Sequence, residues 1–302
     1  MRRRLILLSV TLLAGSILQA QMLPSLLVNA DAAALGTGGS AIASDATAFA
    51  LENNAAAMSF SDKTVFAALS YGLLQPSASG KNQIAFSGWW NSGKRLAAGL
   101  YAKTLRYPSY TIINDNGVVS QTEGDFSPAE NIIGAGASFL ILEGLSVGVT
   151  GRMVTSSLAK DAKATAYGSD ISVCYQKDPL QLGLAFCNLG SKVQYTEESS
   201  YPQPMMLRGG LSYRIMEGLR AQVEADWLLA GGVMGGAGAE YCWKEKVVAR
   251  AGYHIGTGIM QGASYGTLGV GCRLSGVHLD AAWVFAGMNQ RNTLLATLGY
   301  AF

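Results

Sequence analysis

The chain has 302 residues, of which 49% are hydrophobic and only 14% are charged. Soluble globular proteins carry about 25% charged residues, so the composition argues against a surface that faces only water. The 37 glycines and 7 prolines do not fit collagen, and the many apolar residues exclude a disordered chain. The length fits one large barrel, or else two soluble domains.

The first twenty residues have the organisation of a secretory signal peptide. Arg2, Arg3 and Arg4 precede an apolar run over residues 5–18, and Gln19 and Ala20 follow. We expect cleavage after Ala20, so that the mature chain begins at residue 21. That residue is glutamine, whereas a lipid-anchored protein needs cysteine there. The alternative, a transmembrane anchor, requires a longer apolar run.

The mature chain carries almost no net charge. Without the three arginines of the signal peptide, 19 basic residues stand against 20 acidic ones, a net charge of −1. We therefore expect no nucleic-acid partner. The spacing of Cys174, Cys187, Cys242 and Cys272 matches no zinc motif. These cysteines are either disulfide partners in an oxidising compartment or small apolar residues on strands.

Residues 21–62 differ from the rest of the chain. They are rich in Ala, Gly and Ser and lack the alternation of a strand. We predict a short helical or coiled plug in the mouth of a barrel; a flexible periplasmic arm is the alternative. The residues of the expected plug motif are Asp31, Gly36, Gly38, Gly39, Asn53 and Asn54. The glycine strings lack the strand, helix and downstream acid of a dinucleotide site.

Residues 63–302 break into segments of about ten residues that alternate in polarity. In residues 219–227 the odd positions are apolar, and the even ones are Arg220, Gln222, Glu224 and Asp226. Successive side chains on a strand point to opposite faces, so one face would meet lipid and the other the lumen. Residues 145–153, 207–215 and 277–285 repeat the pattern.

We count fourteen such segments, an even number, as bacterial single-chain barrels require. The segments are residues 64–73, 82–91, 95–106, 132–141, 145–156, 165–176, 179–188, 205–215, 219–229, 235–243, 246–255, 265–274, 277–286 and 292–302. Short connections alternate with longer ones, of which 107–131 and 189–204 are the longest. Such barrels have short periplasmic turns and longer outside loops.

These features predict an all-β fold, a transmembrane antiparallel β-barrel of about 14 strands with a small N-terminal plug. The even strand count would place both termini in the periplasm, with the barrel in the outer membrane among its lipids. A soluble β-sandwich also alternates, but its outward faces would be polar. Here the apolar face carries Trp, Tyr and Phe near strand ends, as an aromatic girdle does.

The last segment ends on an aromatic residue. Leu294, Ala296, Leu298, Tyr300 and Phe302 share one face, and the chain stops at Phe302. A terminal aromatic on the lipid face resembles the signal read by the barrel-assembly machinery, which we therefore expect as a partner. The alternative is an ordinary last core strand.

The ionisable residues of the inward faces are expected to pair with one another. Opposite charges on adjacent strands satisfy each other within a lumen. The expected network comprises Arg152, Arg208, Arg214, Arg220, Glu224, Asp226, Arg250 and Asp280.

Catalysis has few candidate residues, since His254 and His278 are the two histidines of the chain. His278 and Asp280 share a face and could orient one another as acid and base. The sequence fixes no Ser or Cys nucleophile beside them, and a structural lumenal network has the same pattern. We expect no enzyme, cofactor or metal.

Several motifs resemble the PorV/PorQ family of outer-membrane proteins. Residues 31–45 and 52–58 are similar to its "GMGGA" run and "NPAG" box, an opening shared more loosely with the FadL-type fatty-acid channels. In order along the chain, its "NLG", "LP..LRLG", "RAGY" and "LDYA" segments resemble residues 186–190, 202–213, 250–253 and 279–283. The resemblance implies a FadL-like barrel of fourteen strands. Asn54 replaces the proline of the family box, and the chain is shorter than typical PorV proteins.

Two functions follow from the resemblance. By similarity to PorV/PorQ, the barrel would be a component of type IX protein secretion or of surface attachment, docking secreted or surface proteins. By similarity to FadL, it would take up a hydrophobic small molecule through a lumen gated by the plug.

The docking hypothesis relies on the loop 107–131. We expect this loop to bind a protein partner because it holds aromatic and apolar anchors. They are Tyr107, Pro108, Tyr110, Ile112, Ile113 and Phe126. The alternative is that the loop packs over the barrel mouth.

Overall fold

The structure is a computed structural model, and it describes residues 23–75, 80–115, 120–196, 200–260, 263–286 and 292–302. Fourteen strands form one sheet that closes on itself. They are β1 (Val65–Leu74), β2 (Lys81–Asn91), β3 (Leu96–Arg106), β6 (Ala129–Leu142), β7 (Leu145–Ala159), β8 (Ala162–Lys177), β9 (Leu180–Gly190), β12 (Met206–Met216), β13 (Leu219–Leu228), β14 (Val233–Trp243), β15 (Val247–Gly256), β16 (Tyr265–Leu274), β17 (Val277–Ala286) and β18 (Leu294–Ala301).

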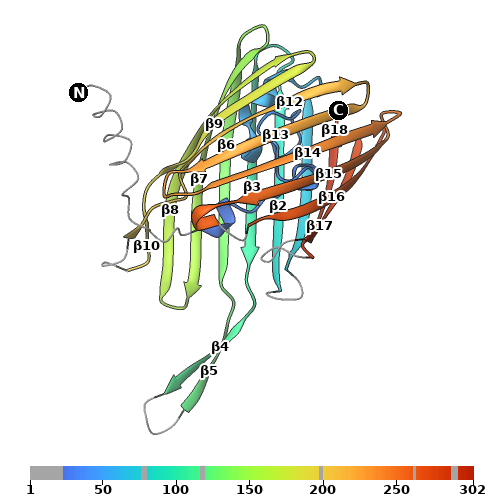
Figure 1. The fold of residues 1–302 in the computed structure, drawn as a ribbon. Coiled ribbons are helices and arrows are strands. Elements are labelled where there is room, and N and C mark those ends of the chain that lie inside the picture. Colours follow the sequence, from blue (N-terminus) through green and yellow to red (C-terminus); the bar gives the residue numbers. More distant parts are fainter. Residues whose placement is uncertain (1–22, 76–79, 116–119, 197–199, 261–262, 287–291) are drawn as a thin grey trace, which may run out of the picture.

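Every strand of the barrel is antiparallel to its neighbours, and β1 pairs with β18 to close the cylinder (Figure 1). Each of the fourteen predicted segments coincides with one of these strands, so the predicted fold is confirmed. At one end of the barrel the connections are tight turns, helped by left-handed backbone at Gly144, Gly218 and Gly276. The C-terminus lies at this end, opposite the hairpin formed by β4 (Tyr110–Asp115) and β5 (Ser120–Phe126).

The two faces of each strand differ sharply in exposure. On β13, Val223 is 45% exposed and Trp227 is 61% exposed, whereas Glu224 and Asp226 between them are buried. The same alternation runs through β7, β12 and β17, as predicted, and the outer face is a continuous apolar belt. On β18, Leu294, Leu298 and Tyr300 are exposed on the outer face together with Phe302. A lipid environment makes such exposure favourable.

Two small sheets lie in the long loops and were not predicted. β4 (Tyr110–Asp115) pairs with β5 (Ser120–Phe126), and Figure 1 shows this hairpin projecting away from the barrel. β10 (Val193–Gln194) pairs with β11 (Ser200–Tyr201) in the loop between β9 and β12. The alternative prediction for this loop is that it packs over the barrel mouth. The hairpin instead projects away from the barrel.

The N-terminal segment lies inside the lumen, as the plug prediction requires. It contains η1 (Pro24–Leu26), α2 (Ala32–Gly36), α3 (Ala50–Asn53) and η2 (Ala55–Phe60). α2 packs against β15 to β18, and η2 packs against β6, β7 and β8. Most residues of this segment are buried, including Leu23, Ile42 and Met58. We call residues 23–62 the plug.

The plug extends further than a cover over one mouth of the barrel. Ser25 donates its backbone N–H to Glu130 at 3.0 Å, and Glu130 lies near the β4–β5 end of β6. At the opposite end, Asn91 binds the carbonyls of Met58 and Ser61. The plug therefore runs along the lumen, and its first described residues lie toward the hairpin end.

Two remaining sequence expectations concern other parts of the chain. The predicted signal peptide and its cleavage site after Ala20 lie outside the described residues. The four cysteines are free, so the disulfide alternative does not hold in this structure. Within the described ranges, the helices are too short or too polar to cross a membrane.

Candidate functional site

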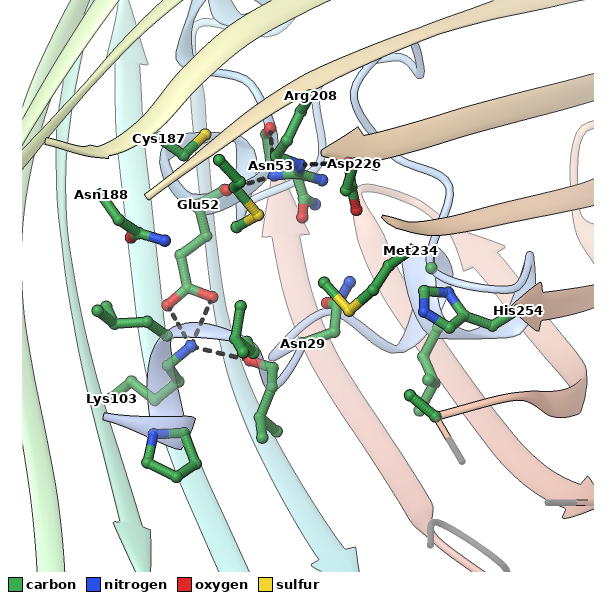
Figure 2. Close-up of a pocket in the computed structure, with 18 of the residues that line it drawn as sticks. Asn29, Glu52, Asn53, Lys103, Cys187, Asn188, Arg208, Asp226, Met234 and His254 are labelled. Carbon is green, nitrogen blue, oxygen red and sulfur yellow. Dashed lines mark hydrogen bonds and ion pairs between the residues drawn. The ribbon is translucent and has the colours of Figure 1, made fainter. Parts of the chain in front are cut away.

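A cavity of about 300 Å³ lies in the lumen between the plug and the barrel wall (Figure 2). Its walls combine apolar side chains with a few charged ones, which is the composition of a small-molecule site. The apolar lining includes Leu26, Leu27, Leu35, Tyr101, Ile132, Met206, Met234, Met260 and Tyr265. The charged lining consists of Glu52, Lys103, Arg152, Asp170, Arg208 and Asp226, with His254 beside them.

One ion pair joins the plug to β3 on the cavity wall. Lys103 Nζ lies 3.1 Å from Glu52 Oε1 and donates to the Val28 carbonyl at 3.0 Å. The side chain of Lys103 is almost fully buried. A buried ammonium needs such partners because leaving it unpaired costs several kcal/mol. Lys103 therefore fixes two separate parts of the plug, and the charge pattern of the sequence had not identified it.

A second pair lies within the wall, between β7 and β8. Arg152 donates to both carboxylate oxygens of Asp170 and to the side chain of Asn188, with Nη1 at 2.7 Å from Asp170 Oδ2. Asn188 has left-handed backbone at a register shift between β8 and β9. Its side-chain Nδ2 also donates a hydrogen bond to the Pro204 carbonyl at 2.7 Å. This pair ties the loop between β9 and β12 to the cavity wall.

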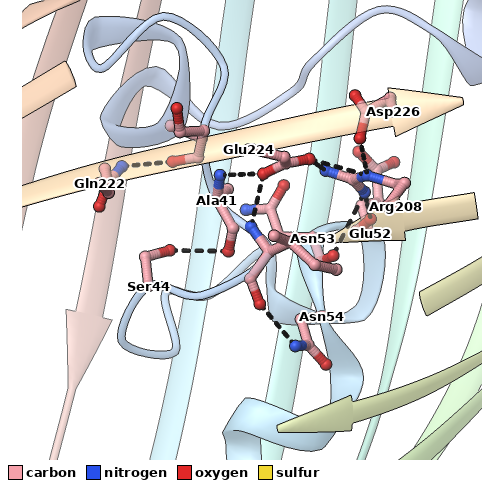
Figure 3. A network of polar contacts seen from close by, with 12 residues as sticks. Ala41, Ser44, Glu52, Asn53, Asn54, Arg208, Gln222, Glu224 and Asp226 are labelled. Atoms are coloured by element: carbon pink, nitrogen blue, oxygen red, sulfur yellow. Dashed lines mark hydrogen bonds and ion pairs between the residues drawn. The ribbon is translucent and has the colours of Figure 1, made fainter. Parts of the chain in front are cut away.

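The third charged group consists of one arginine and two carboxylates. Arg208 on β12 donates its Nε to Glu224 Oε1 at 2.9 Å and to Asp226 Oδ1 at 3.3 Å, and its Nη2 also binds Glu224. Glu224 in turn accepts the backbone N–H groups of Ala41 and Ile42 (Figure 3). The predicted pairing of these three residues is thus observed, and it anchors the plug.

The predicted plug motif forms a hydrogen-bonded node. Asp31 accepts from Thr47 Oγ1 at 2.7 Å and from Asn53 Nδ2 at 3.0 Å, and it caps α2 by accepting from Ala33 N. Burial raises the pKa of the Asp31 carboxyl, although the bonds from Thr47 and Ala33 act in the opposite direction. Asn54 caps η2 and binds the Ile42 carbonyl. The node joins segments of the plug that are about twenty residues apart in sequence.

The glycines of the motif bring the plug backbone against the wall. Gly38 has a φ of +73°, and a Cβ there would lie 2.6 Å from the Tyr253 carbonyl oxygen. Facing it on β15, a Cβ on Gly252 would lie 2.3 Å from Gly38 N. A Cβ on Gly36 would touch Gly269 Cα at 3.1 Å. Glycines on the plug and on the barrel wall therefore allow the two backbones to lie in close contact.

A second cavity, of about 240 Å³, lies on the other side of the Asp31 node. Arg250 joins Glu240 at 2.6 Å and Asp280 at 2.7 Å, and Arg273 also binds Asp280. β16 lies between Arg250 and Asp280, so this pair does not join adjacent strands as expected. Gly271 on β16 makes the pair possible because a Cβ there would lie 2.5 Å from Asp280 Oδ1.

Two arginines of the predicted network behave differently from the others. Arg220 joins Asp45 of the plug at 2.7 Å, a contact that links the wall to the plug. Arg214 is exposed near a turn and pairs with Asp178 at 3.0 Å. The prediction that Arg214 belongs to the lumenal network is therefore wrong, because the strand has reached the end of the barrel there.

The acid and base pair considered for catalysis does not form. The His278 ring packs against Phe66 with centroids 4.8 Å apart, and the Asp280 carboxylate binds Arg250 and Arg273. His254 faces Gly38 O at 3.0 Å and stacks on Tyr265. Among the described residues, no group of three His, Cys, Asp or Glu side chains is placed to hold a metal.

The predicted partner-binding residues are divided between the barrel rim and the hairpin. Tyr107 donates to Glu130 at 3.2 Å, and Lys81 lies 5.0 Å from its ring centre, so Tyr107 belongs to the rim. Tyr110 and Phe126 face each other at the base of the hairpin, with ring centres 5.7 Å apart. Ile112 and Ile113 are paired through their backbones with Gly124 and Thr122.

Several solved structures with the same fold are described as hydrocarbon transporters or channels. The Ralstonia pickettii toluene transporter TbuX matches with a TM-score of 0.61 and 13% identity, over 89% of this chain and 96% of that one. The monoaromatic hydrocarbon channel CymD has a TM-score of 0.63 and 12% identity, over 91% and 97% of the two chains.

A Pseudomonas aeruginosa FadL homologue has a TM-score of 0.61 and 12% identity, over 90% of this chain and 98% of that one. This chain has the FadL-type barrel fold. The FadL-like barrel is therefore confirmed as a fold, whereas the narrower resemblance to PorV/PorQ stays a prediction. No protein-family model matches the sequence, and no curated protein matches it either.

Proposed function

We propose that the protein is an outer-membrane channel that takes up small, largely apolar molecules. The observation that carries this proposal is the cavity of about 300 Å³ inside the barrel, lined by methionine, leucine and tyrosine side chains. A lumen that served only as a scaffold would need no such space. Neighbours of the same fold are described as toluene and monoaromatic hydrocarbon channels, which supports the same class of cargo.

The orientation that fits this role places the tight turns and the C-terminus in the periplasm and the β4–β5 hairpin outside the cell. Bacterial barrels have their short turns on the periplasmic side. A molecule would then meet the cavity before the Asp31 node, and the second cavity would lie on the periplasmic side of that node.

The test is to fill the cavity while leaving the barrel intact. Met206 lines the cavity and is 6% exposed, whereas its neighbour Leu207 faces lipid and is 40% exposed. Met206→Trp adds an indole to the cavity, and Leu207→Trp places the same ring in the membrane, where tryptophan is tolerated. In a Gram-negative host we expect Met206→Trp to lower the uptake of radiolabelled toluene about tenfold or more, toward the rate of cells without the protein.

Leu207→Trp should retain the wild-type rate, with heat-modifiable migration on gels confirming that both variants fold. Equal uptake rates for the two variants would refute the channel proposal.

The docking hypothesis has one observation in its favour, the projecting hairpin (Figure 1). Among the described residues its two strands pair only with each other, so the ribbon is available to a partner. Secretion or surface attachment through this hairpin is a second proposal, and the two are separable because the hairpin does not line the cavity.

A further inference from the structure

Three cations and three carboxylates line the cavity, and Glu224, which pairs with Arg208 without lining the cavity, adds a fourth carboxylate. Glu52 is paired with Lys103, and Asp170 is paired with Arg152, so these four residues neutralise each other. Arg208 is shared by Glu224 and Asp226, one positive charge against two carboxylates. Each buried carboxylate that lacks a counter-charge is costly in a medium of low dielectric constant.

Of the two carboxylates, Asp226 is the one available to an occupant. Glu224 is only 3% exposed, and it is engaged by Arg208 and by two backbone N–H groups of the plug. Asp226 accepts one long hydrogen bond from Arg208, at 3.3 Å, and its carboxyl group also lies within hydrogen-bonding reach of Glu224. It lines the cavity whereas Glu224 does not, and in Figure 2 it lies beside the space between Arg208 and Met234.

The wall next to Asp226 suits the carbon skeleton of a small organic cation. Asp226 is directly paired across the sheet with Met234, and both side chains face inward. His254 and Tyr265 follow on β15 and β16, with their rings stacked 4.7 Å apart. Aromatic faces and polarisable sulfur atoms interact favourably with cations and with aromatic rings.

The cavity also contains a buried hydrogen-bond donor that needs a partner. Arg152 lines the same cavity and is buried, yet its Nε has no hydrogen-bond partner among the described residues. A buried donor of this kind usually has a partner, because leaving it unsatisfied lowers stability. A water molecule in the cavity can accept this bond, whereas an ammonium group, which has no lone pair, cannot.

We propose that the cavity selects small aromatic amines in their protonated form, with the ammonium group against Asp226 and the ring against Met234 and Tyr265. This inference rests on the proposed function and narrows its substrate class. The ammonium supplies the positive charge that Arg208 alone does not provide for two carboxylates. A carboxylate ligand of the same size would meet Asp226 as a like charge and should be excluded.

The experiment compares three probes of nearly equal size on the full chain in lipid nanodiscs: phenethylamine, 2-phenylethanol and 3-phenylpropanoate. Calorimetric titration, with empty nanodiscs as blank, should show phenethylamine binding at least tenfold more tightly than the alcohol. Binding of the carboxylate should be the weakest of the three. This series uses the wild-type protein and does not depend on the folding of any variant.

Asp226→Asn removes the charge but keeps the shape of the side chain. It should reduce the affinity for phenethylamine to that for 2-phenylethanol, without changing the affinity for the alcohol. Glu240→Gln is the matched control because Glu240 belongs to the second cavity, and it should keep the preference for the amine.

An amine that binds no better than the alcohol, or a preference that survives Asp226→Asn, would overturn the inference. In either case, toluene uptake that Met206→Trp abolishes would leave the channel proposal standing. If Met206→Trp does not affect uptake, the channel proposal itself is wrong.

Discussion

At the scale of single residues, the alternation of side chains along a strand determines what each position meets. Val223 faces outward, whereas its neighbour Gln222 binds Thr37 of the plug at 2.7 Å. Two adjacent residues thus have opposite environments although both belong to β13. The register of the whole barrel can therefore be tested at one such pair.

We expect Val223→Arg to destabilise the barrel by about 2 to 4 kcal/mol, because it places a charge on the lipid face near the midplane. Gln222→Arg is the matched change on the lumenal face, where Glu240 and Asp45 line the same cavity, and its cost should be far smaller. Reversible unfolding in lipid bilayers measures both free energies. Equal losses at the two sites would show that the assigned register is wrong.

At the scale of elements, the plug is held by polar contacts and by close backbone packing. Glu224, Arg208, Lys103 and Thr267 bind its backbone or side chains from four different strands. Glycines of the wall, such as Gly252, provide the space in which it sits. Because both kinds of contact must fit together, a small change in the wall should loosen the plug.

Gly252→Ala tests this packing, since the added Cβ would lie 2.3 Å from Gly38 N. Overpacking of this kind costs about 1 to 3 kcal/mol. We expect faster hydrogen exchange of the plug amides over residues 36–40 and faster toluene uptake. Gly151→Ala is the control because no atom lies within 4 Å of a Cβ there. Identical exchange in the two variants would contradict the proposed role of the wall glycines.

The β4–β5 hairpin gives an independent test of the docking hypothesis. Replacing residues 110–126 by a short Gly-Ser linker removes both strands and leaves Tyr107 on the rim. If the hairpin binds surface proteins, as its Tyr110 and Phe126 suggest, the co-purified partners should be lost while toluene uptake continues. An unchanged set of partners would argue against docking through this hairpin, and a loss of uptake would show that it also serves the channel.

At the scale of the whole molecule, the barrel could be predicted and much of its interior could not. The lipid outside and the polar lumen inside impose a period of two on every strand, so fourteen segments could be identified without any contact information. The pairing of Arg208 with Glu224 and Asp226 followed from the same pattern, because β12 and β13 are consecutive.

The contacts that were missed depend on the closed shape of the barrel. Arg250 reaches Asp280 only because glycine replaces a side chain on the intervening strand. Lys103 meets Glu52 only because the plug passes beside β3. A pattern along one strand carries no information about such partners, since they are brought together by the curvature of the sheet and the path of the plug.

The hydrogen bond from Ala32 N to Thr297 Oγ1, at 3.2 Å, has a consequence for the order of events during biogenesis. Ala32 precedes Thr297 by 265 residues and is synthesised before it, and Thr297 belongs to β18. The plug also binds β13 and β16, so its site is complete only after almost the whole wall has formed. Contacts over such long sequence separations form slowly. A segment that is synthesised before every strand of the wall is therefore among the last to reach its final place.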